Sequence, residues 1–256
     1  MTSVLANIGR RWLSLSEGVG QMTLLTLTTW WKFWTTAPDR IEFMRSLYKV
    51  GVQSFPIVVV TALLTGAIMV IQSGQLVAQY EAYGLLGWGA GYATLREVGP
   101  ILIGLMFSGR VGANNTAELG TMRITEQIDA LRALAIDPIP YLLVPRFFAI
   151  VSMMFLLTLV GNLMALVGGT ITSQFLLQVD WRLFVWSLRE YLHLSDLFNG
   201  LIKSVFFGIA IATVSNHFGY HTSGGAVGVG RAVNSSVVFS AVSIFVLDFV
   251  IGYFLP

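Results

Sequence analysis

Long apolar runs without a charge set the pattern of this chain. No residue between Lys49 and Glu81 is charged, and residues 52–71 alone supply the roughly 20 apolar positions that a helix needs to cross a bilayer. Because the apolar positions follow one another instead of alternating, the spans are expected to be helices and not the strands of a barrel. Four more spans are expected, at residues 92–114, 147–179, 197–218 and 232–255. The pattern predicts an all-α, multi-pass membrane bundle of about five helices.

Two segments depart from this pattern. The second span carries Arg96 and Glu97 near its start and Arg110 near its end, although charge is costly within a membrane. Residues 1–45 mix basic and aromatic side chains, which is typical of an amphipathic helix in the headgroup region. These side chains are Arg10, Arg11, Trp12, Trp30, Trp31, Lys32, Phe33 and Trp34. An interfacial N-terminal helix is therefore predicted, and a poorly ordered tail is the alternative.

The composition agrees with a membrane protein and excludes other classes. Hydrophobic residues make up 55% of the 256 positions and charged residues 11%, against about 25% charged in soluble domains. The net charge is only +2 and the basic residues are not clustered, so a nucleic-acid partner is not expected. The chain has no cysteine, which excludes disulfides, thiolate metal sites and cysteine nucleophiles.

The lysines and arginines fall mostly on one predicted side of the membrane. Eleven of the 15 lie before the first span, between the end of the second span and the start of the third, or just before the fifth. Cytoplasmic loops carry the excess of basic residues in membrane proteins. The N-terminus and residues 109–146 are therefore expected in the cytoplasm, and the C-terminus on the opposite side of the membrane.

The cytoplasmic stretch NNTAELGTMRITEQIDALRALAIDP, at residues 114–138, is not membrane-like. Its apolar residues recur at three- and four-residue steps, as on one helix face: Leu119, Met122, Ile124, Ile128, Leu131 and Ala135. Arg123 and Glu126 are spaced for a helical ion pair, and so are Asp129 and Arg132. We expect one amphipathic helix at about residues 117–136, ended by Asp137-Pro138. Such a helix has the shape of a coupling helix, through which an ATPase pushes on a transmembrane subunit; a solvated connector is the alternative.

Three strings in this region make the sequence recognisable. ELGTMRITEQIDAL at residues 118–131, LREVGP at 95–100 and GRVGANNTA at 109–117 closely resemble the MlaE permease family of ABC transporters. The resemblance extends from the N-terminal segment through all five spans, so residues 1–256 are expected to form one permease domain with its bundle at residues 48–256. It implies a homodimeric permease in the inner membrane of a diderm bacterium. Such a permease moves phospholipid between the inner and outer membranes and so maintains outer-membrane lipid asymmetry.

The resemblance also implies partners and functional residues. The partners are a MlaF-like ATPase, a MlaB-like STAS-domain protein and a hexamer of MlaD-like MCE subunits. The LREVGP string would place Glu97 and Val98 near a lipid-binding cavity between the two permease copies. A mostly apolar helix face upstream would take the acyl chains, and consists of Met69, Gln72, Leu76, Val77 and Tyr80. The ATPase contact would consist of Glu118, Arg123, Glu126, Gln127 and Asp129.

Simpler interpretations stay open for two of these assignments. Core packing is the alternative for the apolar face. An ion pair with Arg96 or Lys203 is the alternative for Glu97, and both interpretations of Glu97 could hold together. Asp248, inside the fifth span, is interpreted as a packing residue.

The chain lacks the sequence that holds nucleotide phosphates in a P-loop. That loop needs a Gly-Lys pair, and none of the three lysines, Lys32, Lys49 and Lys203, follows a glycine. ATP and Mg²⁺ are therefore expected on the partner ATPase, with no cofactor in this chain. His217 and His221 have a zinc-ligand spacing, but His193 is predicted on the opposite side, so no metal site is expected.

Two glycine-containing features have structural interpretations. Residues 224–231, GGAVGVGR, lack the flanking strand of a dinucleotide-binding loop and are expected to form a flexible cytoplasmic turn. Gly161, Ala165 and Gly169 form a ridge of small residues that permits close helix approach. The ridge could pack within one subunit or across a dimer.

Two functions from other classes also stay open. An intramembrane lipid-modifying enzyme would use Glu97 or the histidine pair as acid and base, and it would also need a nucleophile or a metal. A passive channel or scaffold would need neither a coupling helix nor an ATPase.

Overall fold

The computed structural model describes the backbone of residues 2–35 and 40–255, and the side chains of this part from residue 16 onward. Every regular element in these ranges is helical, which confirms the predicted all-α class. The α-helices are α1 (Thr2–Thr35), α2 (Arg40–Leu47), α3 (Phe55–Gln79), α4 (Leu86–Ala93), α5 (Gly99–Phe107), α6 (Ala113–Ile124), α7 (Gln127–Ala133), α8 (Val144–Phe175), α9 (Trp181–Tyr191), α10 (Leu194–Tyr220) and α11 (Gly225–Phe254). The shorter elements are the π-helical segments η1 (Tyr48–Val52), η3 (Thr94–Val98), η4 (Ser108–Gly112) and η5 (Ile139–Leu143), and the 3₁₀ turn η2 (Tyr83–Leu85).

Within the described ranges, four helices are long and apolar enough to cross a membrane. They cover Arg40–Gln79, Ile139–Phe175, Leu194–Tyr220 and Gly225–Phe254, and they contain the predicted first, third, fourth and fifth spans almost entirely. The predicted second span is different: it lies in a helical run from Leu86 to Ile124 that consists of α4, α5 and α6 joined by η3 and η4. The multi-pass bundle is confirmed, but the run that contains the predicted second span is not among these four helices, and η3 and η4 interrupt it.

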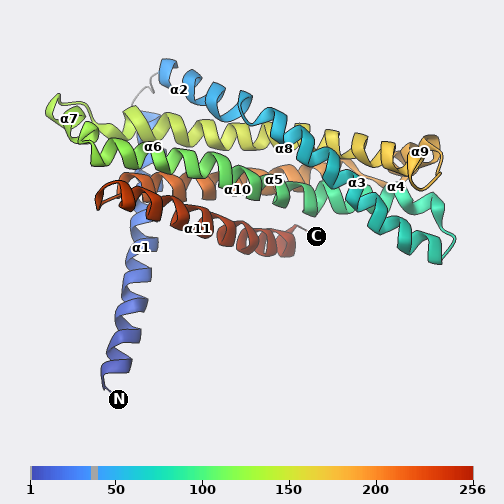
Figure 1. Ribbon diagram of the computed structural model, residues 1–256, viewed down its shortest axis with the longest axis horizontal. Coiled ribbons are helices and arrows are strands. Elements are labelled where there is room, and N and C mark those ends of the chain that lie inside the picture. Colours follow the sequence, from blue (N-terminus) through green and yellow to red (C-terminus); the bar gives the residue numbers. More distant parts are fainter. Residues whose placement is uncertain (1, 36–39, 256) are drawn as a thin grey trace.

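The long helices lie side by side along the longest axis of the molecule, with α8 packed between α3 and α10, and α10 packed on α11 (Figure 1). Helices α6 and α7 lie at one end of the bundle, beside the start of α8, and α4 and α9 lie at the other end (Figure 1). The predicted topology requires α2, α6 and α7 to share one side, and this arrangement meets that requirement. Which end faces the cytoplasm stays a prediction.

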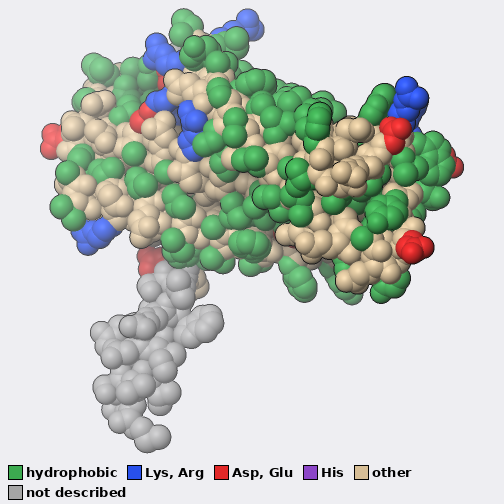
Figure 2. All heavy atoms as spheres, turned by 45° about the vertical axis from the view of Figure 1, so that its right-hand side comes forward, with side chains coloured by type: hydrophobic (Ala, Val, Ile, Leu, Met, Phe, Trp, Pro, Cys, Tyr) green, Lys and Arg blue, Asp and Glu red, His purple; other side chains and the backbone are tan. Residues whose placement is uncertain are grey.

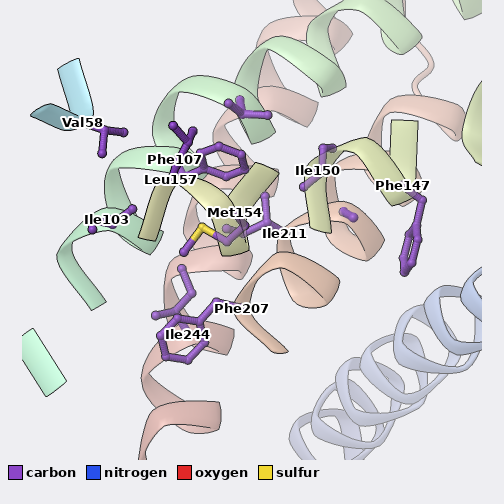
Figure 3. Close-up of a cluster of buried hydrophobic side chains, with 12 residues drawn as sticks. Val58, Ile103, Phe107, Phe147, Ile150, Met154, Leu157, Phe207, Ile211 and Ile244 are labelled. Carbon is purple, nitrogen blue, oxygen red and sulfur yellow. The ribbon is translucent and has the colours of Figure 1, made fainter. Parts of the chain in front are cut away.

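Helix α5 occupies the centre of the bundle. It packs against α3, α8, α10 and α11, and Figure 3 shows its side chains among those of these neighbours. Because four helices pack on α5 and leave only part of it exposed, the run that contains it can carry charged residues at its ends that lipid would not tolerate. The buried hydrophobic cluster drawn in Figure 3 consists of Val58, Ile103, Phe107, Val111, Phe147, Ile150, Met154, Leu157, Phe207, Ile211, Ala212 and Ile244.

The small-residue ridge of α8 packs within the chain, against α3. A Cβ added to Gly66 on α3 would collide with the backbone oxygen of Ala165, and one added to Gly168 would collide with the backbone oxygen of Leu63. Close backbone approach of this kind needs small residues on both helices. The question left open by the ridge at Gly161, Ala165 and Gly169 is thereby resolved in favour of packing within one subunit.

The N-terminal segment is helical, and one of its faces packs on the bundle. The ring centroid of Phe33 lies 3.9 Å from that of Phe148 on α8, whereas Trp31 and Trp34 are exposed. This two-faced character agrees with an amphipathic helix, and α1 points away from the bundle (Figure 1). Its position in the headgroup region stays a prediction. The side chains of Arg10, Arg11 and Trp12 lie outside the described residues.

Two predictions of local structure were wrong. The single helix expected at residues 117–136 is divided, because α6 ends at Ile124 and Glu126 turns the chain with a left-handed φ of 60° before α7 begins. The expected flexible turn at residues 224–231 is mostly the beginning of α11; only Gly224 and Gly225 have positive φ, at 87° and 66°. These two glycines suit a sharp entry into a helix, since they adopt that conformation at little steric cost.

Candidate functional site

Lys203 is the buried centre of a charge network between three elements. Its side chain, on α10, is only 1% exposed, and its Nζ lies 2.9 Å from Oδ1 of Asp248 on α11. Lys203 also forms an ion pair with Glu97 in η3. A charge inside a span needs such partners, because an isolated one is expensive to bury. The ion-pair interpretation of Glu97 is therefore confirmed, and Asp248 is an ionic partner in addition to a packing residue.

Arg96 extends the network to the ends of two helices. Its Nη2 donates a hydrogen bond of 2.7 Å to the backbone oxygen of Leu255, beyond α11, and its Nη1 lies 3.6 Å from Oδ1 of Asp196. Asp196 also accepts a 3.0 Å hydrogen bond from the backbone N–H of His193, the residue just before α10. Arg96 Nε approaches Glu97 Oε1 at 3.9 Å. The run that contains Glu97 is thus tied to both α10 and α11.

The network contains two residues whose roles were missed from the sequence. Asp196 was not considered, and Asp248 was not assigned a charge partner. The signal that could have found them is the cost of burial: Lys203 lies inside a span and needs an acid, and Asp248 lies inside another span and needs a base.

The predicted acyl-chain face of α3 divides between the protein interior and the surface. Met69 and Val77 are partly buried against a cluster that includes Leu86 and Phe184, so core packing holds for these two. The other three, Gln72, Leu76 and Tyr80, are exposed. The exposed fraction is 63% for Leu76 and 80% for Tyr80. Val98, like Glu97, is partly exposed. Lipid binding by these residues stays a prediction.

The predicted ATPase-contact residues lie around the turn between α6 and α7. Glu126, Gln127 and Asp129 are exposed there, and Arg123 is partly exposed at the end of α6. Glu118 is different, because it points back to the bundle and forms ion pairs with Lys49 and with Arg146, whose Nη1 lies 3.4 Å from its Oε2. The exposed part of the set can reach a partner, whereas Glu118 fastens α6 to η1 and α8.

The ion pairs at this turn follow from its shape. Arg123 Nη1 lies 2.8 Å from Asp129 Oδ1, and Arg132 Nη1 lies 2.8 Å from the same oxygen. The predicted pair between Asp129 and Arg132 is therefore confirmed. The predicted pair between Arg123 and Glu126 is wrong, because the chain reverses at Glu126 and brings Arg123 to Asp129 instead.

The underside of the turn is apolar, as the periodicity predicted. Leu119 and Ile128 are fully buried, and Met122 and Leu131 pack against them in a cluster with Leu142 and Leu143. Ala135, at the end of the expected stripe, is exposed because α7 ends at Ala133. Arg132 Nη2 donates a 2.6 Å hydrogen bond to the hydroxyl of Tyr220 at the end of α10. The turn is thus fixed to the bundle on one face and open on the other.

The histidines do not come together as a set of three. The rings of His217 and His221 lie near the end of α10, with centroids 4.6 Å apart. His193 precedes the first residue of α10, so 24 residues at a rise of 1.5 Å put it roughly 36 Å away along the helix. In the described ranges, no three His, Cys, Asp or Glu side chains are grouped so that they could hold a metal ion.

The sequence matches known membrane proteins over nearly its whole length. The family described as Permease MlaE matches residues 43–254. A protein of Rickettsia felis named "Probable ABC transporter permease protein" is 33% identical over 251 residues, which are 98% of this chain and 97% of that protein. A protein of Synechocystis with a similar name is 35% identical over 84% of this chain and 82% of its own length.

A third relative carries a more specific name. The "Intermembrane phospholipid transport system permease protein MlaE" of Haemophilus influenzae is 31% identical over 214 residues, which are 81% of this chain and 80% of that protein. The family match at residues 43–254 includes Glu97, Lys203 and Asp248 and the turn between α6 and α7. The chain, a multi-pass membrane protein, therefore belongs to the MlaE permease family.

Proposed function

We propose that this chain is the membrane-spanning subunit of an ABC transporter that moves phospholipid between the inner and outer membranes of a diderm bacterium. In this proposal, transport maintains the lipid asymmetry of the outer membrane, and ATP and Mg²⁺ are bound by a partner ATPase. The family supports the permease role, and the name of the Haemophilus relative supports the substrate. The observation that carries the proposal is the helical run from Leu86 to Ile124, which connects the exposed turn at Glu126 to the Glu97 network.

A force applied at the turn has a direct route to the network. Helix α6 continues through η4 into α5, and α5 is preceded directly by η3, which contains Glu97. Short π-helical segments inside a longer helix are frequent at functional sites, and here they interrupt the run on both sides of α5. We propose that the ATPase binds Glu126, Gln127 and Asp129, and that its motion is transmitted along this run. Glu118 then anchors the moving helix to its neighbours.

The proposed lipid path follows from the outer face of α3. A phospholipid needs an apolar wall for its chains and a polar group for its headgroup. The exposed side chains of Leu76 and Tyr80 offer apolar surface, and Glu97 retains partial exposure although it is paired with Lys203. In the proposal, a second copy of the chain faces this surface, and lipid lies between the two.

The proposed assembly has further subunits and a defined orientation. It contains two copies of the chain, a MlaF-like ATPase, a MlaB-like STAS-domain protein and an MCE hexamer like MlaD. The exposed turn faces the cytoplasm, where the ATPase binds, and the C-terminus lies in the periplasm. The distribution of the basic residues supports this orientation.

The geometry gives less support to a lipid-modifying enzyme. Such an enzyme would use Glu97 or the histidine pair as acid and base, but Glu97 is held by Lys203. His217 lies 14 residues beyond Lys203 on the same helix, or roughly 21 Å away. Glu97 and the histidine pair therefore cannot act together on one substrate bond, and each would have to act without the other.

The lipid path can be tested with a photo-crosslinking amino acid in the full chain in its native membrane. We expect capture of phospholipid at Leu76 and Tyr80. Two control positions on α8 bracket the result: Leu163, which is 51% exposed, reports the surrounding bilayer, and Met154, which is fully buried, reports background. Leu76 and Tyr80 should exceed both controls, and capture at Leu76 that only equals Leu163 would show that the bulk bilayer is being probed.

A further inference from the structure

A polar cavity lies at the opposite end of the interrupted run from the Glu97 network. It is formed by α2 and η1, by η4 and α6, and by the start of α8, and its volume is about 490 Å³, which is within the usual range for ligand pockets. Arg110, in its wall, is 13 residues beyond Glu97, or roughly 20 Å along a helix. Figure 2 shows basic and acidic side chains toward both ends of the molecule, separated by a largely uncharged middle. The cavity is thus distinct from the proposed lipid path.

Positive charge is in excess around this cavity. Four basic and two acidic side chains line it: Arg45, Lys49, Arg110, Arg146, Glu42 and Glu118. Glu42 pairs with Arg45 at 3.1 Å, and Glu118 pairs with both Lys49 and Arg146. Among the side chains that the structure describes, no acid forms an ion pair with Arg110. The six charges leave a net charge of +2 that an anion in the cavity would balance.

An unsatisfied hydroxyl also lines the cavity. Ser54, just before α3, is 1% exposed, and its Oγ has no hydrogen-bond partner in the described part of the chain. Burying a hydroxyl without a partner costs free energy, and nearly all buried polar groups have one. An oxyanion in the cavity would supply the missing acceptor. The excess charge and the free hydroxyl are independent observations that indicate the same kind of ligand.

We propose that this cavity binds the phosphate group of a phospholipid headgroup from the membrane leaflet at this end of the bundle. Phosphate oxygens suit guanidinium groups, which bind them through two parallel charge-assisted hydrogen bonds. Arg110 supplies the unpaired cation, Arg146 adds a largely buried one, and Ser54 donates the hydroxyl proton. The proposal rests on the proposed function only in taking a phospholipid, and not free phosphate, as the source of the phosphate group.

The cavity also touches the element that we propose to move. Glu118 lies on α6 and is held by two of the cavity's cations, Lys49 and Arg146. A bound phosphate would compete with Glu118 for these cations and would loosen the attachment of α6 to η1 and α8. Occupancy of the cavity and movement of α6 are therefore linked.

The test is native mass spectrometry of the full chain in a neutral detergent. Three probes are compared: dioctanoyl phosphatidylglycerol, dioctanoylglycerol without the phosphate, and inorganic phosphate. We expect the phosphatidylglycerol to bind and the dioctanoylglycerol to bind much more weakly. Arg110→Gln should raise the apparent Kd for phosphatidylglycerol about tenfold, which corresponds to about 1.4 kcal/mol. The matched control Arg40→Gln removes an exposed arginine that does not line the cavity and should leave the Kd unchanged.

A second variant separates binding from folding. Ser54→Ala removes a hydroxyl that lacks a partner, so the thermal midpoint without lipid should stay equal or rise, while phosphatidylglycerol binding weakens. Equal affinities for Arg110→Gln and Arg40→Gln, or equal binding of dioctanoylglycerol, would overturn the proposal. Inorganic phosphate that binds as tightly as phosphatidylglycerol and displaces it would overturn the lipid source. A failure here is distinguishable from failure of the lipid path, which is judged by capture at Leu76.

Discussion

Replacing Lys203 with methionine would remove the cation that Glu97 and Asp248 share, and would leave Asp248 without an ionic partner in the described part of the chain. The side chain of Lys203 is 1% exposed, and its ammonium group is shared by Glu97 and Asp248. Removing one partner of a buried ion pair costs about 3–5 kcal/mol, because the other charge stays buried and unpaired. Asp248, at 17% exposure, carries most of this cost, whereas Glu97, at 39%, is partly screened by solvent. We therefore expect Lys203→Met to lower the free energy of unfolding by about 3 kcal/mol.

The same geometry predicts the ranking of related variants. Glu97→Gln should cost only about 1 kcal/mol, because Lys203 retains Asp248. The triple variant Lys203→Met, Glu97→Gln, Asp248→Asn should recover most of the loss, since removing all the charges leaves none unpaired. The measurement is reversible unfolding of the purified chain in mixed micelles by titration with SDS. A stability of Lys203→Met within about 0.5 kcal/mol of the unsubstituted chain, or a triple variant less stable than Lys203→Met, would refute the role of the network.

Three further predictions concern packing, coupling and pH. Gly66→Ala should lower the free energy of unfolding in the same assay by about 1–3 kcal/mol, because the added methyl group collides with the backbone of α8. The control Gly89→Ala adds a methyl group that meets no atom within 4 Å, so it should be neutral or slightly stabilising. Equal losses for the two variants would contradict the packing argument. Glu126→Lys should weaken co-purification of the partner ATPase by about 2–5 kcal/mol if the charge is buried in the contact, and unchanged ATPase binding and hydrolysis would place the contact elsewhere. Burial acts to raise the pKa of Asp137, but hydrogen bonds from Lys32 and from a backbone N–H hold that pKa below its ordinary value of 3.8. A lowered pKa stabilises the folded state above the ordinary value, and this stabilisation is lost as the pH falls through the lowered pKa. Asp137→Asn should therefore cost up to about 1 kcal/mol at neutral pH and nothing in strong acid, where the carboxyl group is protonated in both states; a cost independent of pH would contradict the ion pair.

The spans could be predicted from the sequence because length and apolarity are local properties. The turn at Glu126 could not, since no glycine or proline marks it and glutamate adopts positive φ only rarely. The pairing of Arg123 with Asp129 depends on that turn, so it was beyond prediction as well. The π-helical segments η3 and η4 likewise leave no signature in a pattern that is read with a period of 3.6 residues.

The sites depend on contacts between distant parts of the chain. Each of the two charges, Lys203 and Asp248, could be recognised from the sequence as costly within its span. The two residues are 45 positions apart and lie on different helices, so their pairing could be assigned only from the packing of α10 on α11. The cavity draws its charges from residues 42–146. From the sequence alone, the four basic residues of the cavity indicate only the membrane topology, because no local sequence pattern shows that they line one cavity.

The central claim is that ATP hydrolysis by a separate subunit drives phospholipid movement through this chain. Its most direct test is a reconstituted transport assay, in which proteoliposomes contain the purified chain with or without its ATPase partner and a fluorescent phospholipid is followed after addition of ATP and Mg²⁺. The chain alone should hydrolyse no ATP, and lipid movement above the protein-free rate should appear only when both subunits and ATP are present. Robust hydrolysis by the contaminant-free chain, or lipid movement at the same rate without the ATPase, would contradict the account.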